Sequence, residues 1–284
     1  MPITAPLPRW LPALLRRLRG GPSGALAAIR GPDGPPLPRP TAPICAVGDI
    51  HGRADLLDAM VERVTAEIAA AGPAAAGARV VVLGDMVDRG PDSATVLDRL
   101  HGLACRAPAR WTCLMGNHER MMLDFAAVPD AQARWLRFGG DRTLTSFGVT
   151  VPDPADPDAL EQAGAALRAA LARRPGLTAW LDGLPALWRD GPAGRIAAVH
   201  AGADPRRPLE RQDPAALIWG HPDFARRPRR DGTWVVHGHV VVPEPTVARG
   251  RINVDTGAWR SGRLSAAWLD ASGLRFLEAR ADGR

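Results

Sequence analysis

The sequence of 284 residues contains no lysine and no tyrosine, and it has only three cysteines. Every basic side chain apart from histidine is therefore an arginine, which we interpret as a compositional bias and not as a sign of function. The number of cysteines is odd, and the spacing of Cys45, Cys105 and Cys113 fits no Cys-x-x-Cys metal pattern. Nothing here requires an oxidising compartment. Cys45 and Cys113 lie in apolar runs, so we expect them to pack as small buried hydrophobic residues.

No apolar run approaches the roughly 18–20 residues that a membrane-spanning helix needs. The hydrophobic content of 46% supports a full core, and we expect a cytoplasmic protein. The formal net charge is +6, but residues 1–43 alone hold six arginines and one aspartate. About +1 therefore remains for everything after residue 43, so the high pI is no sign of a nucleic-acid-binding core. We predict no nucleic-acid partner.

Residues 1–43 are rich in proline and glycine, and such a segment buries too little surface to fold alone. We therefore predict a disordered N-terminal extension followed by one folded domain at residues 44–284. Within the extension, residues 10–19 could form a short basic amphipathic helix that contacts a membrane surface or a partner. We favour the disordered extension over this alternative. The apolar stretch is too short and too broken by arginine to resemble a signal peptide.

Three times, a short apolar run ends in a glycine that is followed directly by a residue able to bind a metal. Stretches with apolar residues at helical spacing separate these runs, as in strand–helix–strand crossovers. Right-handed crossovers place the carboxyl ends of parallel strands along one edge of a sheet, where sites form. The predicted strands are residues 44–47, 79–83 and 111–115, and the metal-capable residues that follow them are Asp49, Asp85 and Asn117.

The second half of the chain contains further predicted strands, two of which end near a histidine. Residues 151–185 lack strand signals and are rich in alanine and leucine, so they predict a helical insertion beside the site. The last two segments alternate like a closing antiparallel pair. The predicted strands are residues 195–199, followed by His200, then 233–236, followed by Gly238-His239, then 251–254, 262–270 and 274–279.

Taken together, three signatures and two later histidines resemble the phosphoprotein phosphatase family, in particular its bacterial serine/threonine protein phosphatases. This family lies within the calcineurin-like phosphoesterase superfamily. The resemblance covers about residues 44–270 and implies a four-layer α/β/β/α fold, with a central β-sandwich flanked by helices. The signatures are Gly-Asp-Ile-His-Gly at residues 48–52, Gly-Asp-Met-Val-Asp-Arg-Gly at 84–90 and Gly-Asn-His-Glu at 116–119, followed by His200 and His239.

The resemblance also implies two divalent metal ions, Mn²⁺ first and Fe, Zn or Mg as alternatives. Hard divalent metals prefer carboxylate, amide oxygen and imidazole ligands, which are the residue types present here. Asp85 would bridge the two metals. One metal would be held by Asp49, His51 and Asp85, and the other by Asp85, Asn117, His200 and His239.

Two metals about 3.5–4 Å apart clamp a phosphate and activate a shared water. The implied reaction is in-line attack on phosphorus by the hydroxide that bridges them. His118 would protonate the leaving alkoxide, and Asp88 would orient His118. Arg89 and Asn117 would bind the phosphate oxygens.

One position departs from the family pattern. Bacterial relatives often carry a phosphate-gripping arginine where this chain has His221. His221 could bind the substrate in its place, or a nearby arginine could reach in: Arg226, Arg227, Arg229 or Arg230. A solvated loop is the alternative for this arginine cluster.

The predicted substrates are phosphomonoesters, first of all phosphoserine and phosphothreonine in proteins, or small phosphate esters. The alternative is symmetrical cleavage of diadenosine tetraphosphate. Sequences similar to that hydrolase tend to carry alanine where this chain has Asp88, which favours the protein phosphatase branch. A further alternative is a metal-binding scaffold without turnover that docks partners through its basic extension.

Overall fold

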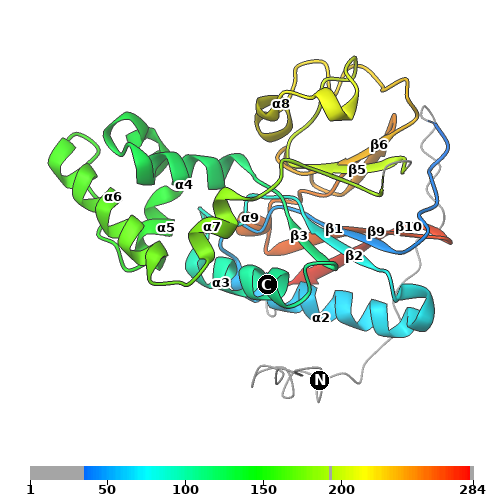
Figure 1. The fold of residues 1–284 in the computed structure, drawn as a ribbon, viewed down its shortest axis with the longest axis horizontal. Coiled ribbons are helices and arrows are strands. Elements are labelled where there is room, and N and C mark those ends of the chain that lie inside the picture. The colour runs from blue at the N-terminus through cyan, green and yellow to red at the C-terminus, as the bar shows by residue number, and fades with distance from the viewer. Residues whose placement is uncertain (1–34, 192–193, 282–284) are drawn as a thin grey trace.

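The computed structural model describes residues 35–191 and 194–281. Two five-stranded sheets pack face to face, and helices cover the outer face of each sheet (Figure 1). This confirms the predicted four-layer α/β/β/α fold. The first sheet has the order β10-β9-β1-β2-β3, with strands β1 (Ile44–Val47), β2 (Arg79–Val82), β3 (Trp111–Cys113), β9 (Arg263–Asp270) and β10 (Gly273–Arg280). The second has the order β4-β5-β6-β8-β7, with β4 (Leu187–Arg189), β5 (Ile196–Val199), β6 (Trp234–His237), β7 (Thr246–Ala248) and β8 (Arg251–Asn253).

Along the chain the helices lie between the strands, and in the fold they lie outside the two sheets (Figure 1). The α-helices are α2 (Ala54–Ala71), α3 (Ser93–Arg106), α4 (Asn117–Ala127), α5 (Gly140–Ser146), α6 (Pro157–Ala172), α7 (Leu177–Asp182), α8 (Pro214–Trp219) and α9 (Ala258–Ser261). The described part of the chain also contains 3₁₀ helices at Gly72–Ala75, Asp130–Phe138 and Leu209–Arg211.

Strand β1 shows why the sequence builds layers. Its four residues are all buried, because side chains that alternate along a strand enter two different cores. Ile44 and Ala46 pack between the two sheets, whereas Cys45 and Val47 pack against the helices that cover the first sheet. A third core lies between the second sheet and α8, where Val199 packs with Leu217.

The parallel strands bring their carboxyl ends together. In the first sheet β1, β2 and β3 are parallel, and in the second β5, β6 and β8 are parallel. The two sets meet at one place, because the ring of His200, just after β5, contacts the carbonyl of Leu83, just after β2. The edge predicted from the first three strands is therefore faced by residues of the second sheet.

The cysteines behave as expected. Cys45 and Cys113 are buried and Cys105 is exposed, and all three are free thiols. Burial raises the pKa of the Cys45 thiol to about 12, so this side chain is an uncharged hydrophobic residue at neutral pH.

Residues 1–34, including the possible amphipathic helix at 10–19, lie outside the described residues. The remainder of the predicted extension, residues 35–43, contacts the second sheet: Leu37 packs against the core between the sheets, and Trp234 Nε1 donates to Pro36 O at 3.2 Å. The segment at 151–185 contains α6 and α7, whose apolar faces join the same core as α4. No helix among the described residues combines the length and apolarity needed to span a bilayer.

Candidate metal centre

The backbone is strained where the site residues lie. In the described part of the chain, six residues other than glycine have a positive φ, and five of them are predicted site residues with φ between 47° and 75°. Such conformations cost about 1–3 kcal/mol each and persist where the surrounding structure enforces them. The sharp turns after β1, β2 and β6 therefore serve to aim side chains. The five residues are His51, Asp85, Asp88, Arg89 and His239.

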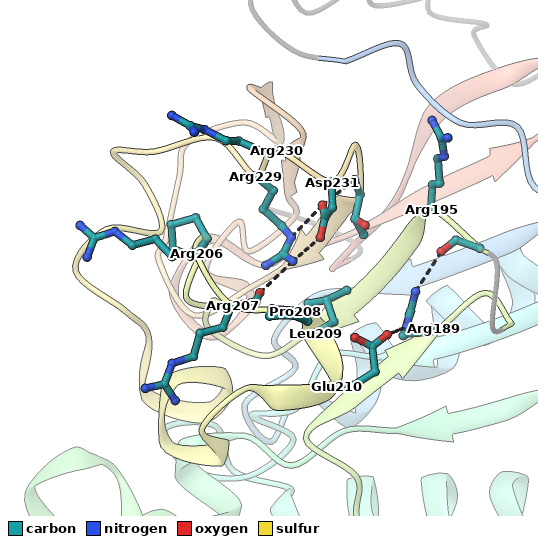
Figure 2. A pocket seen from close by; sticks show the side chains of 13 residues that line it. Arg189, Arg195, Arg206, Arg207, Pro208, Leu209, Glu210, Arg229, Arg230 and Asp231 are labelled. Carbon is teal, nitrogen blue, oxygen red and sulfur yellow. Dashed lines mark hydrogen bonds and ion pairs between the residues drawn. The ribbon is translucent and has the colours of Figure 1, made fainter.

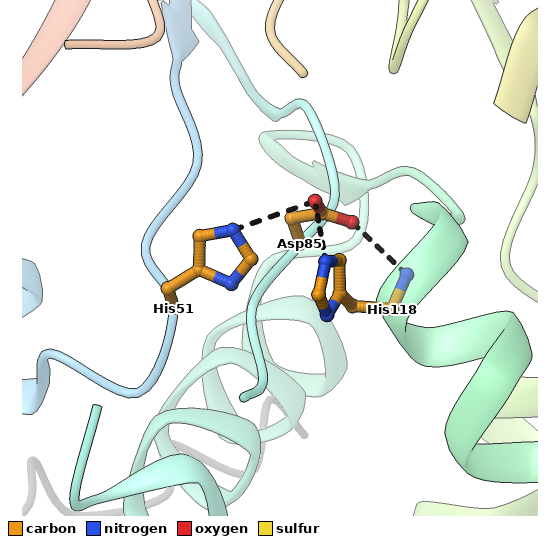
Figure 3. A group of neighbouring side chains, drawn as sticks. All are labelled: His51, Asp85 and His118. Carbon is orange, nitrogen blue, oxygen red and sulfur yellow. Dashed lines mark hydrogen bonds and ion pairs between the residues drawn. The ribbon is translucent and has the colours of Figure 1, made fainter. Parts of the chain in front are cut away.

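Asp85 lies at the centre of the cluster (Figure 3). Its Oδ2 is 3.5 Å from His51 Nε2 and 3.8 Å from His118 Nε2. Its Oδ1 is 3.2 Å from His200 Nε2 and accepts a hydrogen bond from the backbone N–H of His118 at 3.1 Å. One carboxylate thus faces three imidazoles that come from both sheets.

The hydrogen bonds of the histidines identify their tautomers. His51 Nδ1 donates to Val87 O at 2.7 Å, and His200 Nδ1 donates to Leu83 O at 3.0 Å. Burial lowers the pKa of His51 to about 3 and that of His200 to about 4, so both rings are neutral and their Nε2 atoms carry lone pairs. These lone pairs point at the carboxylate oxygens of Asp85. A cation bound between them would relieve the repulsion between these lone pairs and the carboxylate.

A second group of ligand atoms lies on the other side of Asp85. Asn117 Oδ1 is 2.8 Å from His200 Nε2 and 2.9 Å from His239 Nδ1. One potential ligand atom each from Asp85, His200 and His239 lies within 4.8 Å of the other two, and the same holds for His51, Asp85 and His118. Two adjacent sites that share Asp85 can therefore be assembled.

Asp49 lies beside the cluster and belongs to neither of these two groups. Its Oδ2 accepts the backbone N–H of His239 at 3.0 Å, but its buried Oδ1 has no hydrogen-bond partner among the described residues. Burial raises the pKa of Asp49 well above its ordinary value, and the nearby Asp255 and Asp85 raise it further. An unpaired buried carboxylate oxygen is costly unless a cation binds it. The oxygen and imidazole donors of this cluster fit hard divalent metals.

His118 and Asp88 form a buried pair beside the cluster. His118 Nδ1 lies 2.6 Å from Asp88 Oδ2, which also accepts from Trp135 Nε1 at 2.7 Å, while Asp88 Oδ1 accepts from the Thr143 hydroxyl at 2.6 Å. Burial lowers the pKa of His118, but Asp85 and Asp88 outweigh it, so the pKa is raised. Burial raises the pKa of Asp88, whereas the hydrogen bonds from His118, Thr143 and Trp135 lower it. These three donors favour the charged form, so we assign Asp88 as the carboxylate.

Arg89 lies against the same histidine. Its Nη2 is 3.3 Å from His118 Nε2, and its Cζ lies 5.2 Å from the centre of the Trp259 ring. Within the described residues the guanidinium has no carboxylate partner at ion-pair distance, so its charge is available to an anion. The half-exposed Trp259 holds it by a cation–π contact.

Glu119 fixes the loop that carries Asp85. Its fully buried carboxylate accepts four backbone N–H groups: those of Asp85 at 2.8 Å, Met86 at 2.7 Å, Val87 at 3.2 Å and Gly116 at 3.0 Å. Burial raises the pKa of Glu119 to about 8, and Asp85 contributes. Four donors, two on each oxygen, nevertheless leave no position for a proton, so we assign the ionised form.

Some predicted residues lie apart from this cluster. His221 Nδ1 accepts the backbone N–H of Asp223 at 3.2 Å, and its Nε2 is 3.9 Å from Asp204 Oδ2. Arg229 is bound to Asp231 and to backbone carbonyls of another loop. Neither side chain contacts the residues around Asp85 in the described interactions.

Sequence reasoning assigned no role to four residues that now contact the site residues. Glu119 belongs to the Gly-Asn-His-Glu signature, which was a signal for it. Trp135, Thr143 and Trp259 stand in no signature, and no sequence pattern connects them with Asp88 or Arg89.

Residues 42–258 match the calcineurin-like phosphoesterase family. The chain belongs to this family. Over 236 residues it is 25% identical to the asymmetrical bis(5'-nucleosyl)-tetraphosphatase PrpE of Geobacillus thermodenitrificans. The aligned region covers 78% of this chain and 87% of that protein.

Solved structures agree on the fold of this phosphoesterase. A putative diadenosine tetraphosphatase superposes with a TM-score of 0.56 at 21% identity and covers 87% of this chain and 97% of the other. A protein serine/threonine phosphatase from Saccharomyces cerevisiae superposes with a TM-score of 0.52 at 15% identity, covering 88% and 85%. At these identities the likeness shows the fold and does not identify the substrate.

Proposed function

We propose that this phosphoesterase hydrolyses phosphomonoesters, first of all phosphoserine and phosphothreonine in proteins, with two divalent metals of which Mn²⁺ is the first candidate. The observation that carries the proposal is the buried pair of His118 and Asp88, next to a cluster of ligand atoms around Asp85.

The ligand assignment follows the family resemblance, and the geometry supports it in part, because the atoms that could hold a metal group as His51, Asp85 and His118 and as Asp85, His200 and His239. Asp49, His51 and Asp85 would hold one metal, and Asp85, Asn117, His200 and His239 the other. When bound, such a pair of cations polarises the phosphate and supplies an activated water as the nucleophile.

The remaining steps belong to side chains of the chain itself. Arg89, whose guanidinium has no carboxylate partner among the described residues, binds the phosphate oxygens and stabilises the charge that develops on them. The amide side chain of Asn117, whose Oδ1 lies 2.8 Å from His200 Nε2, would add a polar contact to the phosphate without adding negative charge. Asp88 fixes the ring of His118 so that Nε2 faces the space beside Asp85.

The two candidate substrate classes differ in whether the leaving group needs a proton from His118. A serine or threonine alkoxide is a strong base and has to be protonated as the ester bond breaks, whereas a nucleotide leaves from an anhydride as a stable anion. Burial lowers the pKa of His118, whereas Asp85 and Asp88 raise it, and the bond from Nδ1 to Asp88 favours the protonated ring that a general acid needs. This arrangement suits phosphomonoesters with poor leaving groups.

Hydrolysis of a bis(5'-nucleosyl) tetraphosphate is the second candidate. It is favoured by the curated relative of that name, to which the chain is similar over most of both lengths. The two candidates need the same metals and the same Arg89, so they differ only in the leaving group and in the surface around the site.

The test begins with p-nitrophenyl phosphate and Mn²⁺, compared with metal-free protein. A metal-loaded protein without turnover would refute the proposed phosphatase activity and favour the alternative of a metal-binding scaffold. Phosphoserine and phosphothreonine peptides are then compared with diadenosine tetraphosphate, and the nucleotide products show whether cleavage is symmetrical.

The variant His118→Asn separates the two substrate classes. We expect it to slow hydrolysis of alkyl phosphates by about 10²–10⁴-fold and to change anhydride cleavage much less. Higher kcat/KM for diadenosine tetraphosphate than for every phosphopeptide would overturn the phosphomonoester proposal in favour of the second candidate.

A further inference from the structure

A large cavity of about 470 Å³ lies away from the metal-ligand cluster, between the loop at 205–210, the loop at 229–231 and the β4–β5 edge (Figure 2). Arg195 precedes β5 and His200 follows it, so the strand separates them by roughly 16 Å. The cavity therefore belongs to a different part of the surface. We call the arginines that line it the basic surface: Arg189, Arg195, Arg206, Arg207, Arg229 and Arg230.

The basic surface has more positive charge than its neighbours can balance. Among the described residues that line it there are two acids, Glu210, which pairs with Arg189, and Asp231, which pairs with Arg229. Arg195 and Arg230 have no carboxylate at ion-pair distance within the described residues.

Two further arginines have only weak partners. Arg206 reaches Asp223 at 2.7 Å and Arg207 reaches Asp204 at 3.6 Å, and both arginine side chains are 61% exposed. Exposed pairs of this kind contribute little and exchange readily with other anions. Arg195 and Arg230 thus lack a carboxylate partner among the described residues, and the exposed guanidiniums of Arg206 and Arg207 can be reached by a further anion.

The loops that carry Arg206, Arg207 and Arg230 are tied together by Arg229, whose side chain is only 6% exposed. It binds the carboxylate of Asp231 and donates to the carbonyls of Asp204 at 3.1 Å and Arg207 at 3.0 Å. This joins the segment that carries Arg206 and Arg207 to the segment that carries Arg230. A fixed framework lowers the entropic cost of binding at its exposed side chains.

The directions of the side chains indicate the shape of the partner. Figure 2 shows Arg206, Arg207 and Arg230 extending away from one another into solvent, with Arg195 at the far side. A single phosphate could not reach all of them, but an extended chain with spaced carboxylates could. A hollow of about 460 Å³, lined by Arg227 and sharing Arg206 and Arg230, continues the same charge.

We propose that the basic surface binds an acidic segment of a partner polypeptide. Single-stranded nucleic acid is less suited, because its binding sites combine cations with aromatic side chains that stack on bases, and none of the described residues lining this cavity is aromatic. The positive charge of the basic surface is also not a property of the domain as a whole, since residues after 43 carry a net charge of only about +1. The proposal does not depend on the reaction at the metal-ligand cluster.

The test measures binding of a fluorescein-labelled octaglutamate peptide to the full chain by fluorescence anisotropy at low ionic strength. The double variant Arg195→Glu/Arg230→Glu should lower the affinity at least tenfold. The control Arg173→Glu/Arg280→Glu makes the same change in net charge at exposed arginines elsewhere and should keep the affinity within about twofold. Thermal unfolding and p-nitrophenyl phosphate hydrolysis check that each variant is folded.

Equal losses in both double variants would show attraction by overall charge alone and would overturn the proposal. So would a labelled oligonucleotide that binds more tightly than the peptide and loses affinity in the first variant only. Absence of p-nitrophenyl phosphate hydrolysis together with site-specific peptide binding would refute the enzymatic proposal and leave this one standing.

Discussion

Replacing Glu119 with glutamine tests whether this carboxylate holds the metal-ligand loop. The two side chains have nearly the same shape, so the change creates no cavity. The amide oxygen can still accept two of the four backbone N–H groups, but the amide nitrogen cannot accept the other two. Two buried N–H donors then face an NH₂ group.

The expected loss follows from the number of hydrogen bonds. A hydrogen bond to a charged group contributes about 1.5–3 kcal/mol, so two lost bonds lower the free energy of unfolding by about 3–6 kcal/mol. For a chain of this size the midpoint of thermal unfolding should fall by roughly 6–12 °C. Because Asp85 is the first residue of the held loop, metal affinity should also fall, by about 10–100-fold.

Differential scanning calorimetry and titration of the metal-free protein with Mn²⁺ measure these two quantities. Glu161→Gln is the matched control, because Glu161 is 63% exposed and pairs only with Arg168, so its midpoint should stay within about 2 °C. A Glu119→Gln protein that unfolds at the wild-type temperature and binds Mn²⁺ with wild-type affinity would refute the role of the four hydrogen bonds.

Three further predictions concern the site itself. Asp85→Asn should abolish p-nitrophenyl phosphate hydrolysis, since both ligand groups share this carboxylate; measurable turnover with two bound Mn²⁺ ions would contradict it. Trp259→Ala should raise KM and the inhibition constant of inorganic phosphate about threefold to tenfold, with kcat little changed. Trp259→Phe should return KM and this inhibition constant most of the way to the wild-type values. An unchanged inhibition constant in Trp259→Ala would show that the cation–π contact does not help Arg89 to bind phosphate. Burial lowers the pKa of His118, but Asp85 and Asp88 raise it above its ordinary 6.5, so the proton donor is present below that raised pKa and lost above it. The rate with alkyl phosphates should therefore fall on the alkaline side, and a pH profile of His118→Asn that keeps the same alkaline limb would assign it to another group.

The sequence was sufficient where the signal is local. Strands β1, β2 and β3 are short apolar runs that each lead to a glycine, and the residue after that glycine is a potential ligand, so Asp49, Asp85 and Asn117 could be identified from neighbouring residues alone. The order of strands and helices then fixed the parallel pairing, because a crossover of this length returns the chain to the same edge.

The sequence was insufficient where a contact joins distant segments. Trp135 and Thr143 lie 47 and 55 residues from Asp88, and they reach it only because the segment after α4 folds back over the β2 loop. Trp259 meets Arg89 in the same way. Such contacts leave no periodic pattern in the chain.

From the sequence alone came the types of ligand, their order and the sheet edge at which the first three lie. The family resemblance had grouped His200 with Asp85, but the tertiary structure alone showed that the ring of His200, after strand β5 of the second sheet, donates to the carbonyl of Leu83 after β2, and that Arg229 is held by Asp231. The physical reason is that local geometry follows from neighbouring residues, whereas the meeting of the two sheets depends on how their buried faces pack together.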